Sequence, residues 1–327
     1  MADVIISAPG QVAGTGDRLA NFLKIFGGEV ITAFERTSKT FNRHQSRTIN
    51  AGKSAAFPCI GRATAQYLAP GKSLDDIRQN ILQGEVNILI DGLLTADCLI
   101  SDIDDAIAHY DVRQEYSRQL GEALGYACDG ATLAEIAKMV VADAENVAGL
   151  GSPEIIPLTG STGTDPISAT LGALYTDALA KAKYYMDTNF VPEEERTAYV
   201  MPDVMAAMVN AKTVINNDYN GTGSIATGTV LMVHGFEIVQ VPGLTRGGAS
   251  VTNILQGDGH VFPTTYASTC KILTAHRTSV GTLKLKDLGM EHARRAEYQA
   301  DQVIGKMAVG HKGLRPETVT MTTLTLS

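Results

Sequence analysis

The 327-residue sequence has no run of about 20 apolar residues, the length that a membrane-spanning helix needs. Its first residues, Met-Ala-Asp-Val, carry no basic cluster or apolar stretch typical of a cleavable signal peptide. The few cysteines are far apart and form no CxxC pair: Cys59, Cys98, Cys128 and Cys270. We therefore expect free thiols, no membrane contact and a protein made in the cytoplasm of its host cell.

Basic charge is also scarce, because the formal net charge is −8. This balance argues against a general nucleic-acid binder, which would carry a basic surface. Residues 36–53 nevertheless hold five lysines and arginines and no acid, whereas residues 101–149 hold ten carboxylates against three basic residues. Either these are two solvated faces, or the basic segment lies against the acidic segment of another copy.

No motif for catalysis or metal binding is complete. Gly52-Lys53-Ser54 looks like the end of a phosphate-binding loop, but Arg47 stands where the first glycine is required, and Phe57-Pro58 prevents a helix from starting there. The seven histidines show no HxxxH spacing. A calcium-loop pattern from Asp102 fails at its sixth position, Ile107. We therefore predict no catalytic, cofactor-binding or metal-binding residue; the enzyme alternative is an ATPase that uses Lys53.

What the sequence does contain, near its start, is elements that cannot bury their apolar side chains alone. Leu19, Phe22, Leu23 and Phe26 form an amphipathic helical stripe. Between residues 54 and 98, two strand-like runs flank a polar segment with a Pro70-Gly71 turn, which predicts a long hairpin. Each element needs another surface to pack on, since an isolated hairpin is marginal in water.

A long helix is predicted next, over about residues 102–146. Ser101 and Asp104 match a capping box, apolar residues recur at helical spacing, and Gly121, Gly125 and Gly130 are possible bends. Its length, on the order of 60 Å, exceeds an ordinary small domain.

The rest of the chain predicts an α+β unit. A Gly/Pro-rich boundary at residues 149–166 precedes a helix at 167–188. A buried strand follows at 196–202, then a short helix capped by Asp203, and finally two strands that break at Gly235.

Four blocks resemble one family: "DRLANFLKIFGGEVITAFERTSKTFNRHQSRTINAGKSAAFPCIG", "YLAPGKSLDD", "IDGLLTADCLISDIDDAIAHYDVRQEYSRQLGEAL" and "HRTSVGTLKLKDLGMEHARRAEYQADQVIGKMAVGHKGLRPE". They look like the major capsid protein of T-seven-type short-tailed bacteriophages. The resemblance covers about the first 140 and the last 50 residues, whereas the middle matches in layout only. It implies the α+β tailed-phage capsid fold, named after phage Hong Kong ninety-seven.

In that fold the N-terminal arm would be residues 1–53, the extended loop 54–98, the peripheral domain 99–150 with 276–327, and the axial domain 151–275. The implied function is a structural, non-enzymatic subunit that assembles as hexamers and pentamers into an icosahedral shell around double-stranded DNA. The implied partners are other copies, a scaffolding protein, a portal protein at one vertex and a decoration or cement protein. The alternative within the fold is a nanocompartment shell that packages a cargo enzyme.

Contacts between subunits are expected from the arm, the extended loop and the far end of the peripheral domain: Leu19, Phe22, Phe26, Phe57, Tyr67, Leu68, Lys72, Asp75, Asp76, Arg294 and Arg295. One conflict concerns residues 290–307, whose composition favours a helix. The fold that the resemblance implies has long strands there, and we predict strands because tertiary context can override propensity.

Overall fold

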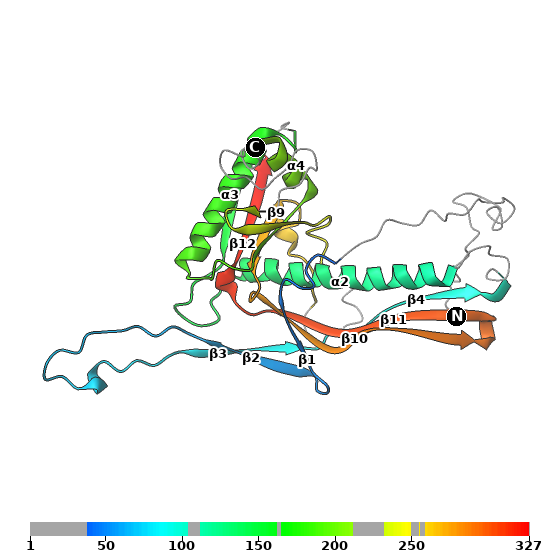
Figure 1. The fold of residues 1–327 in the computed structure, drawn as a ribbon, viewed down its shortest axis with the longest axis horizontal. Coiled ribbons are helices and arrows are strands. Elements are labelled where there is room, and N and C mark those ends of the chain that lie inside the picture. Colours follow the sequence, from blue (N-terminus) through cyan, green and yellow to red (C-terminus); the bar gives the residue numbers. More distant parts are fainter. Residues whose placement is uncertain are drawn as a thin grey trace.

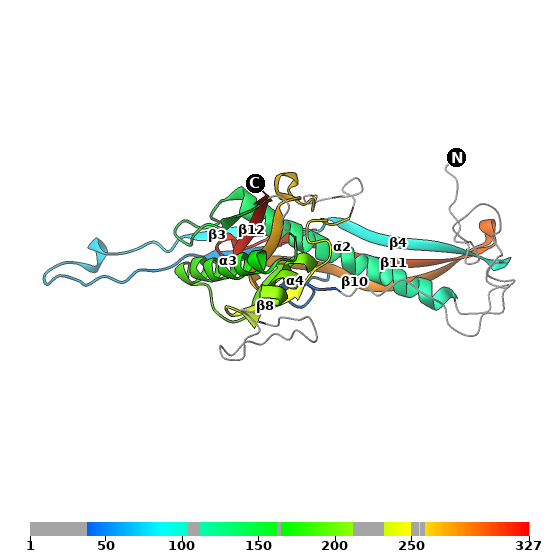
Figure 2. The ribbon, with the colours of Figure 1, turned by 90° about the horizontal axis from the view of Figure 1, so that it is seen from above.

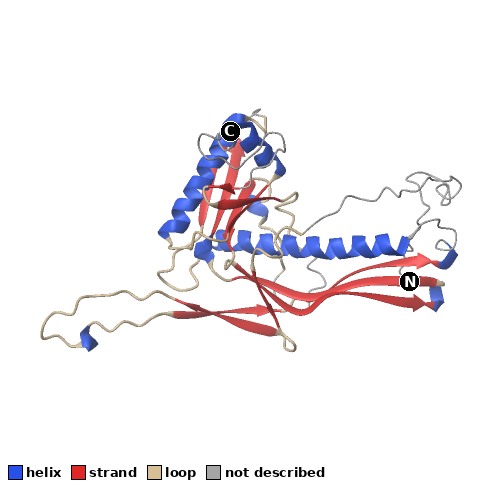
Figure 3. Cartoon of the chain, in the orientation of Figure 1, coloured by secondary structure: helices blue, strands red, loops and turns tan. Residues whose placement is uncertain are grey.

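The computed structural model describes residues 38–103, 112–161, 165–211, 232–249, 255 and 259–326. Its strands form a six-stranded sheet, a long four-stranded sheet and a two-stranded hairpin. A long helix, α2 (Val112–Ala142), lies beside the four-stranded sheet, and its C-terminal end reaches the six-stranded one (Figures 1 and 3). Seen from above, the hairpin and the long sheet extend in opposite directions (Figure 2). The molecule is therefore elongated, with its helices near the middle.

The six-stranded sheet has the order β5-β12-β9-β6-β8-β7. The bounds of these strands are Glu154–Gly160, Val319–Leu326, Cys270–His276, Arg196–Val200, Phe236–Gln240 and Met232–Val233, in that order. The sheet is mixed, since β12 pairs parallel with β5, and β6 parallel with β8, while the other pairs are antiparallel.

Both faces of the six-stranded sheet are covered by helices, and successive side chains of β6 pack against one face and then the other. Ala198 and Val200 pack with α3 (Ala169–Thr188) and α4 (Pro202–Ala211), whereas Tyr199 between them packs with the C-terminal half of α2. Successive strand residues point to opposite faces. All five residues of β6 are buried, so this strand runs through the centre of the core.

The four-stranded sheet has the order β1-β10-β11-β4. Its strands are Gln45–Thr48, Val280–Arg295, Ala300–Gly313 and Gly92–Ser101. Residues 290–307 are therefore strand except for a short turn, as predicted. The reason is packing: Met307 and Val309 of β11 contact Leu124 of α2 in a small core, and the burial of these side chains outweighs local helix propensity.

The hairpin consists of β2 (Ser54–Ile60) and β3 (Gln83–Leu89), paired antiparallel from Ser54 with Leu89 to Ile60 with Gln83. We placed residues 92–98 in the extended loop, but they belong to β4, which pairs with β11. Likewise β12, which we grouped with the peripheral domain, is a central strand of the six-stranded sheet. The domain division as a whole stays a prediction.

Helix α2 is shorter than predicted at its C-terminal end, where Asp143 has a positive φ of 43° and ends it. Residues 104–111, including Asp104 of the capping box, lie outside the described residues. The helix is continuous through the three glycines at which we expected bends. Gly130 is there for another reason: a Cβ on it would lie 1.8 Å from the carbonyl oxygen of Gly247.

Four further predictions can be compared with the structure. The helix at 167–188 and the two strands that break at Gly235 are present. The strands turn at His234 and Gly235, both with positive φ, as in a type I′ hairpin. The boundary at 149–166 was wrong in part, because it contains β5. Asp203 does not cap α4; it lies in the first turn and pairs with Lys271 at 2.6 Å.

Candidate functional site

The tip of the hairpin, residues 61–82, carries apolar side chains that no other part of the described chain covers. Tyr67 is fully exposed at 103% of its reference area. Four neighbours are at least two-fifths exposed: Leu68, Leu74, Ile81 and Leu82. Such a group of exposed large apolar side chains is typical of a surface that another molecule covers.

The base of the hairpin is fixed to its own subunit. Ile88 is fully buried with Ile90, Leu283 and Leu314, and Phe57 packs partly buried against them. Phe57 therefore makes its main contacts within the chain, and the tip residues differ from it in this respect. Because the base is anchored, the tip projects in a defined direction (Figure 1).

The charged residues of the tip are exposed and locally ordered. Ser73 accepts a hydrogen bond from the Asp75 amide at 3.2 Å and caps a short 3-10 helix that ends at Asp76. Asp75 forms an ion pair with Arg78. Lys72 lies beside this turn and is exposed. Exposed ion pairs of this kind contribute about 0–1 kcal/mol.

Arg294 and Arg295 lie at the other end of the molecule, where β10 turns into β11. Arg294 pairs with Asp102 and Asp301. Arg295 donates to Gln302 at 2.8 Å. The structure therefore separates the two sets of predicted contact residues (Figure 2). Leu19, Phe22 and Phe26 lie outside the described residues.

The phosphate-loop alternative is excluded by the local backbone. Gly52 has a φ of 111°, and strand β2 starts one residue after Lys53. The Lys53 carbonyl accepts a hydrogen bond from Ile90 at 2.9 Å, which closes the hairpin base. No helix N-terminus follows, so backbone amides cannot surround a phosphate there.

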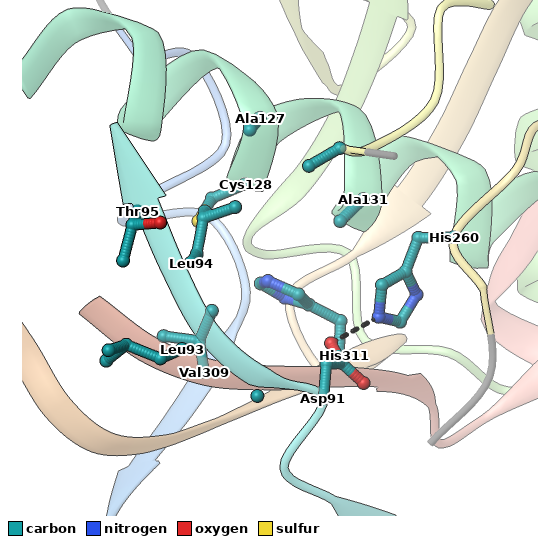
Figure 4. A pocket seen from close by; sticks show the side chains of 12 residues that line it. Asp91, Leu93, Leu94, Thr95, Ala127, Cys128, Ala131, His260, Val309 and His311 are labelled. Atoms are coloured by element: carbon teal, nitrogen blue, oxygen red, sulfur yellow. Dashed lines mark hydrogen bonds and ion pairs between the residues drawn. The ribbon is translucent and has the colours of Figure 1, made fainter. Parts of the chain in front are cut away.

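We did not predict a buried cluster of charged side chains that includes Glu135 of α2. His260 contacts Asp91, 2.6 Å from its Nε2 (Figure 4), and on its other side Glu135, 3.0 Å from its Nδ1. Lys138 adds a second bond to Glu135 at 2.8 Å. Burial alone would lower the pKa of His260, but the two carboxylates raise it to about 9. The imidazole is therefore a cation at neutral pH, and it joins α2 to the start of β4.

The pKa values of the two carboxylates move in opposite directions. Burial raises the pKa of Asp91, and the hydrogen bond with His260 only partly opposes it. Burial would also raise the pKa of Glu135, but bonds from His260 and Lys138 hold it below its ordinary value. The pKa of Glu135 is lowered while that of Asp91 is raised because Glu135 has two cationic partners, His260 and Lys138.

A second polar series runs from the segment before β1 to β10 and β11. His44 contacts Thr282 of β10 at 2.7 Å, and Thr282 contacts His311 of β11 at 2.9 Å. His311 is 5.4 Å from His260, ring centre to ring centre, and lines a cavity of about 240 Å³ below α2 (Figure 4). No sequence spacing indicated these contacts, because the partners are up to 238 positions apart.

The basic segment does not need another copy to meet acidic residues. Asp129 of α2 accepts four hydrogen bonds, from the amides of Lys39 and Thr40 and from the hydroxyls of Ser38 and Thr40. Arg43 pairs with Glu237 of β8. These contacts lie within one chain, which neither of the two alternatives that we left open had included.

Within the described parts of the chain, no group of three or more His, Cys, Asp or Glu side chains could hold a metal ion. No helix in that part is long and apolar enough to cross a membrane. The notable features are the projecting apolar tip of the hairpin and two buried polar clusters, one around His260 and one formed by His44, Thr282 and His311.

Comparison with known proteins identifies the family. A family model described as "Gp10A-like: Major capsid protein" matches residues 56–322. The chain belongs to this family of phage major capsid proteins. It is 49% identical to the major capsid protein of Enterobacteria phage T3, over 94% of this chain and 92% of that protein. It is 48% identical to the major capsid protein of Escherichia phage T7, over 94% and 92%.

Comparison with solved capsid structures identifies the fold of this capsid protein. The capsid of cyanophage P-SCSP1u is 34% identical, covers 100% of both chains and has a TM-score of 0.78. The mature capsid of bacteriophage PhiM1 shares the fold at 20% identity, with a TM-score of 0.75 over 99% of both chains. The capsid protein therefore has the α+β tailed-phage capsid fold. The similarity extends through the middle of the chain, beyond the blocks that carried the resemblance, and it supports a phage shell rather than a nanocompartment.

Proposed function

We propose that this capsid protein assembles as hexamers and pentamers into an icosahedral shell that encloses phage double-stranded DNA. The observation that carries the proposal is the exposed apolar tip around Tyr67, on a hairpin whose base is anchored in its own subunit. A fully buried large apolar side chain contributes roughly 1.5–3 kcal/mol, so covering this tip with a neighbouring subunit would favour assembly. Many modest contacts of this kind add up in a closed shell.

The role of the chain in the shell is structural, with no catalytic step. The partners that we propose beyond other copies are a scaffolding protein, a portal protein at one vertex and a decoration or cement protein. Assembly takes place in the cytoplasm of the bacterial host. The apolar stripe Leu19, Phe22 and Phe26 of the arm would be covered by the inner side of the shell or by the scaffolding protein.

Apolar contacts at the tip should matter more than charged ones. We expect the double change Tyr67→Ser with Leu68→Ser to abolish particles, because it removes the apolar surface that a neighbour covers. Lys72→Ala should reduce particle yield slightly at most, since exposed ion pairs contribute about 0–1 kcal/mol. Sedimentation velocity and electron microscopy measure the yield of particles from the overexpressed chain.

Circular dichroism of the same variants is the control for folding. Both variants should keep the wild-type spectrum, because the tip makes few contacts with the body of its subunit. Normal particles from the Tyr67/Leu68 variant would show that the tip is not an assembly contact. Loss of its secondary structure would show that the tip stabilises its own subunit instead.

A further inference from the structure

The first described segment of the chain, residues 38–48, is attached to the body by the hydrogen bonds to Asp129, by the Arg43–Glu237 ion pair and by a short strand. Its four-residue strand β1 is exposed along its length and, among the described residues, pairs with Gly281–Lys284 of β10. Asp129 holds the residues before β1, as described above. Between these two attachments lies His44, whose side chain is 8% exposed. An exposed strand at the edge of a sheet, as β1 is, opens locally at a lower free energy than the core does.

The protons along His44, Thr282 and His311 can be assigned from the acceptors. The Nδ1 of His44 lies 2.8 Å from the carbonyl oxygen of Thr40 and must donate to it, because a carbonyl only accepts. In neutral His44 the Nε2 then accepts from the Thr282 hydroxyl. The Thr282 oxygen in turn accepts from the Nδ1 of His311. This order of donors uses each proton once and requires the Nε2 of His44 to be unprotonated.

An added proton disrupts the series. If the Nε2 of His44 is protonated, Thr282 can no longer donate to it. The Nε2–H of His44 then donates to the Thr282 oxygen, and the hydroxyl proton keeps an acceptor only if His311 moves its own proton from Nδ1 to Nε2. The Nε2 of His311 is fully buried and has no hydrogen-bond partner among the described residues, and the ring points into the cavity below α2 (Figure 4). A cation on either ring is therefore poorly solvated.

The charges around the two rings mostly oppose protonation. Burial lowers the pKa of His44; Lys284 and Arg277 lower it further, and the Thr40 carbonyl and Asp129 only partly compensate. Burial lowers the pKa of His311 well below its ordinary value, helped by His260 and by His44. His260 is itself held as a cation by Asp91 and Glu135, with Lys138 beside them.

We propose that the series His44–Thr282–His311 is a latch that holds residues 38–48 on the long sheet at neutral pH and releases them in mild acid. The neutral imidazole of His44 is the form that the closed latch binds. Its contribution is present above the ordinary pKa of histidine, near 6.5, and is lost as the pH falls below it. Opening exposes His44 to water, where it accepts the proton freely.

The consequence for the shell rests on the proposed function. Residues 38–48 belong to the predicted N-terminal arm, residues 1–53, and fix it to the body of the subunit, so release would loosen any contact that the arm makes with a neighbour. The latch itself is a property of one chain. It can therefore be tested on unassembled subunits, and a failure of the latch leaves the assembly proposal untouched.

Hydrogen exchange read by mass spectrometry at pH 7.5 and 5.0, corrected for the intrinsic exchange rates, measures the latch. The reporting amides are those of Gln45, bonded to the Arg277 carbonyl at 3.1 Å, and Ile49, bonded to the Lys284 carbonyl at 2.9 Å. We expect their protection to fall by up to about 30-fold at pH 5.0, the limit for one histidine that cannot be protonated in the closed state. Peptides from α3 should keep their protection.

Two variants separate the latch from a general effect of acid. His44→Gln keeps a side-chain donor and an acceptor but cannot titrate, so the protection of residues 38–48 should become equal at the two pH values. His276→Gln removes another histidine whose pKa burial lowers but which lies outside the series. This variant should keep the acid-induced loss.

Two results would overturn the latch. One is wild-type protection of residues 38–48 that is the same at pH 7.5 and 5.0. The other is an acid-induced loss in His44→Gln as large as in the wild type. If circular dichroism shows that His44→Gln does not fold, Thr282→Val is the variant to measure, because it removes the central hydroxyl of the series. In this variant the protection of residues 38–48 at pH 7.5 must fall, and the dependence of that protection on pH must shrink.

Discussion

His260 carries the clearest electrostatic assignment at the scale of single residues. Its pKa of about 9 exceeds the ordinary value of 6.5 because Asp91 and Glu135 stabilise the cation. A histidine with a raised pKa contributes stability that is complete below 6.5 and is lost as the pH rises through 9. A shift of this size corresponds to a contribution on the order of 3 kcal/mol.

We therefore expect His260→Gln to be less stable than the wild type at pH 6.5, and the difference between them to shrink toward pH 9.5. Urea unfolding of both proteins at several pH values measures it. Comparing the two proteins at each pH removes the effect of lysine, cysteine and tyrosine titration. A difference in the free energy of unfolding that stays constant with pH would contradict the assigned charge.

Two glycines of α2 allow a matched test of close packing. Gly130 faces the backbone of Gly247, and a Cβ there has no room, whereas a Cβ on Gly121 would meet nothing within 4 Å. Gly130→Ala should lower the free energy of unfolding by about 1–3 kcal/mol, the usual cost of overpacking. Gly121→Ala should raise it by about 0.5–1 kcal/mol, because alanine favours the helix. Chemical denaturation compares them, and equal effects would contradict the packing of α2 on the 243–249 segment.

At the scale of elements, the hairpin is divided into an anchored base and a projecting tip. Ile88 of β3 is fully buried in the base, while Ile60 of β2 is 59% exposed. The alternation of buried and exposed residues along both strands turns one face of the hairpin toward its own subunit. The outer face and the tip remain available to a neighbour.

The same truncation at these two positions should have different effects. Ile88→Ala leaves a cavity and should lower the free energy of unfolding by about 2–5 kcal/mol. Ile60→Ala should change it by no more than about 0.5 kcal/mol, as is usual at the surface. Urea unfolding of the unassembled subunit measures both. Similar losses would mean that the hairpin base is not part of the core.

At the scale of the whole molecule, the shell should not depend on disulfides. All four cysteines are free: Cys59 and Cys270 are buried, and Cys98 and Cys128 are partly buried. Burial raises the pKa of Cys128 and of Cys270 to about 12. Their thiols are therefore protonated at neutral pH, and a thiol is a poor nucleophile for disulfide exchange.

Assembled particles that are alkylated before lysis should accordingly give the same bands on reducing and non-reducing gels. The control is a sample left without the alkylating reagent, which reveals disulfides that form only after the cells are opened. Ladders that survive alkylation and disappear on reduction would contradict the prediction.

Several elements followed from the sequence because their signals are local. The turn at Gly235 needs positive φ, which glycine allows, and the helix at 167–188 is present as α3, with a Ser168 cap that we did not predict. The exposed tip around Tyr67 and Leu68 was also predicted, since a hairpin of this length cannot cover its own apolar residues. The strands at 290–307 came from the family resemblance and not from local propensity.

Only the tertiary structure decided where distant segments meet. Strand β5 was missed because its local signal is a Gly/Pro-rich run, and its partner β12 lies more than 150 residues further along the chain. The pairing of His260 with Asp91 and Glu135, and of His44 with Thr282, joins residues between 125 and 238 positions apart. Such contacts depend on the packing of α2 against two sheets, and no local pattern of residues encodes them.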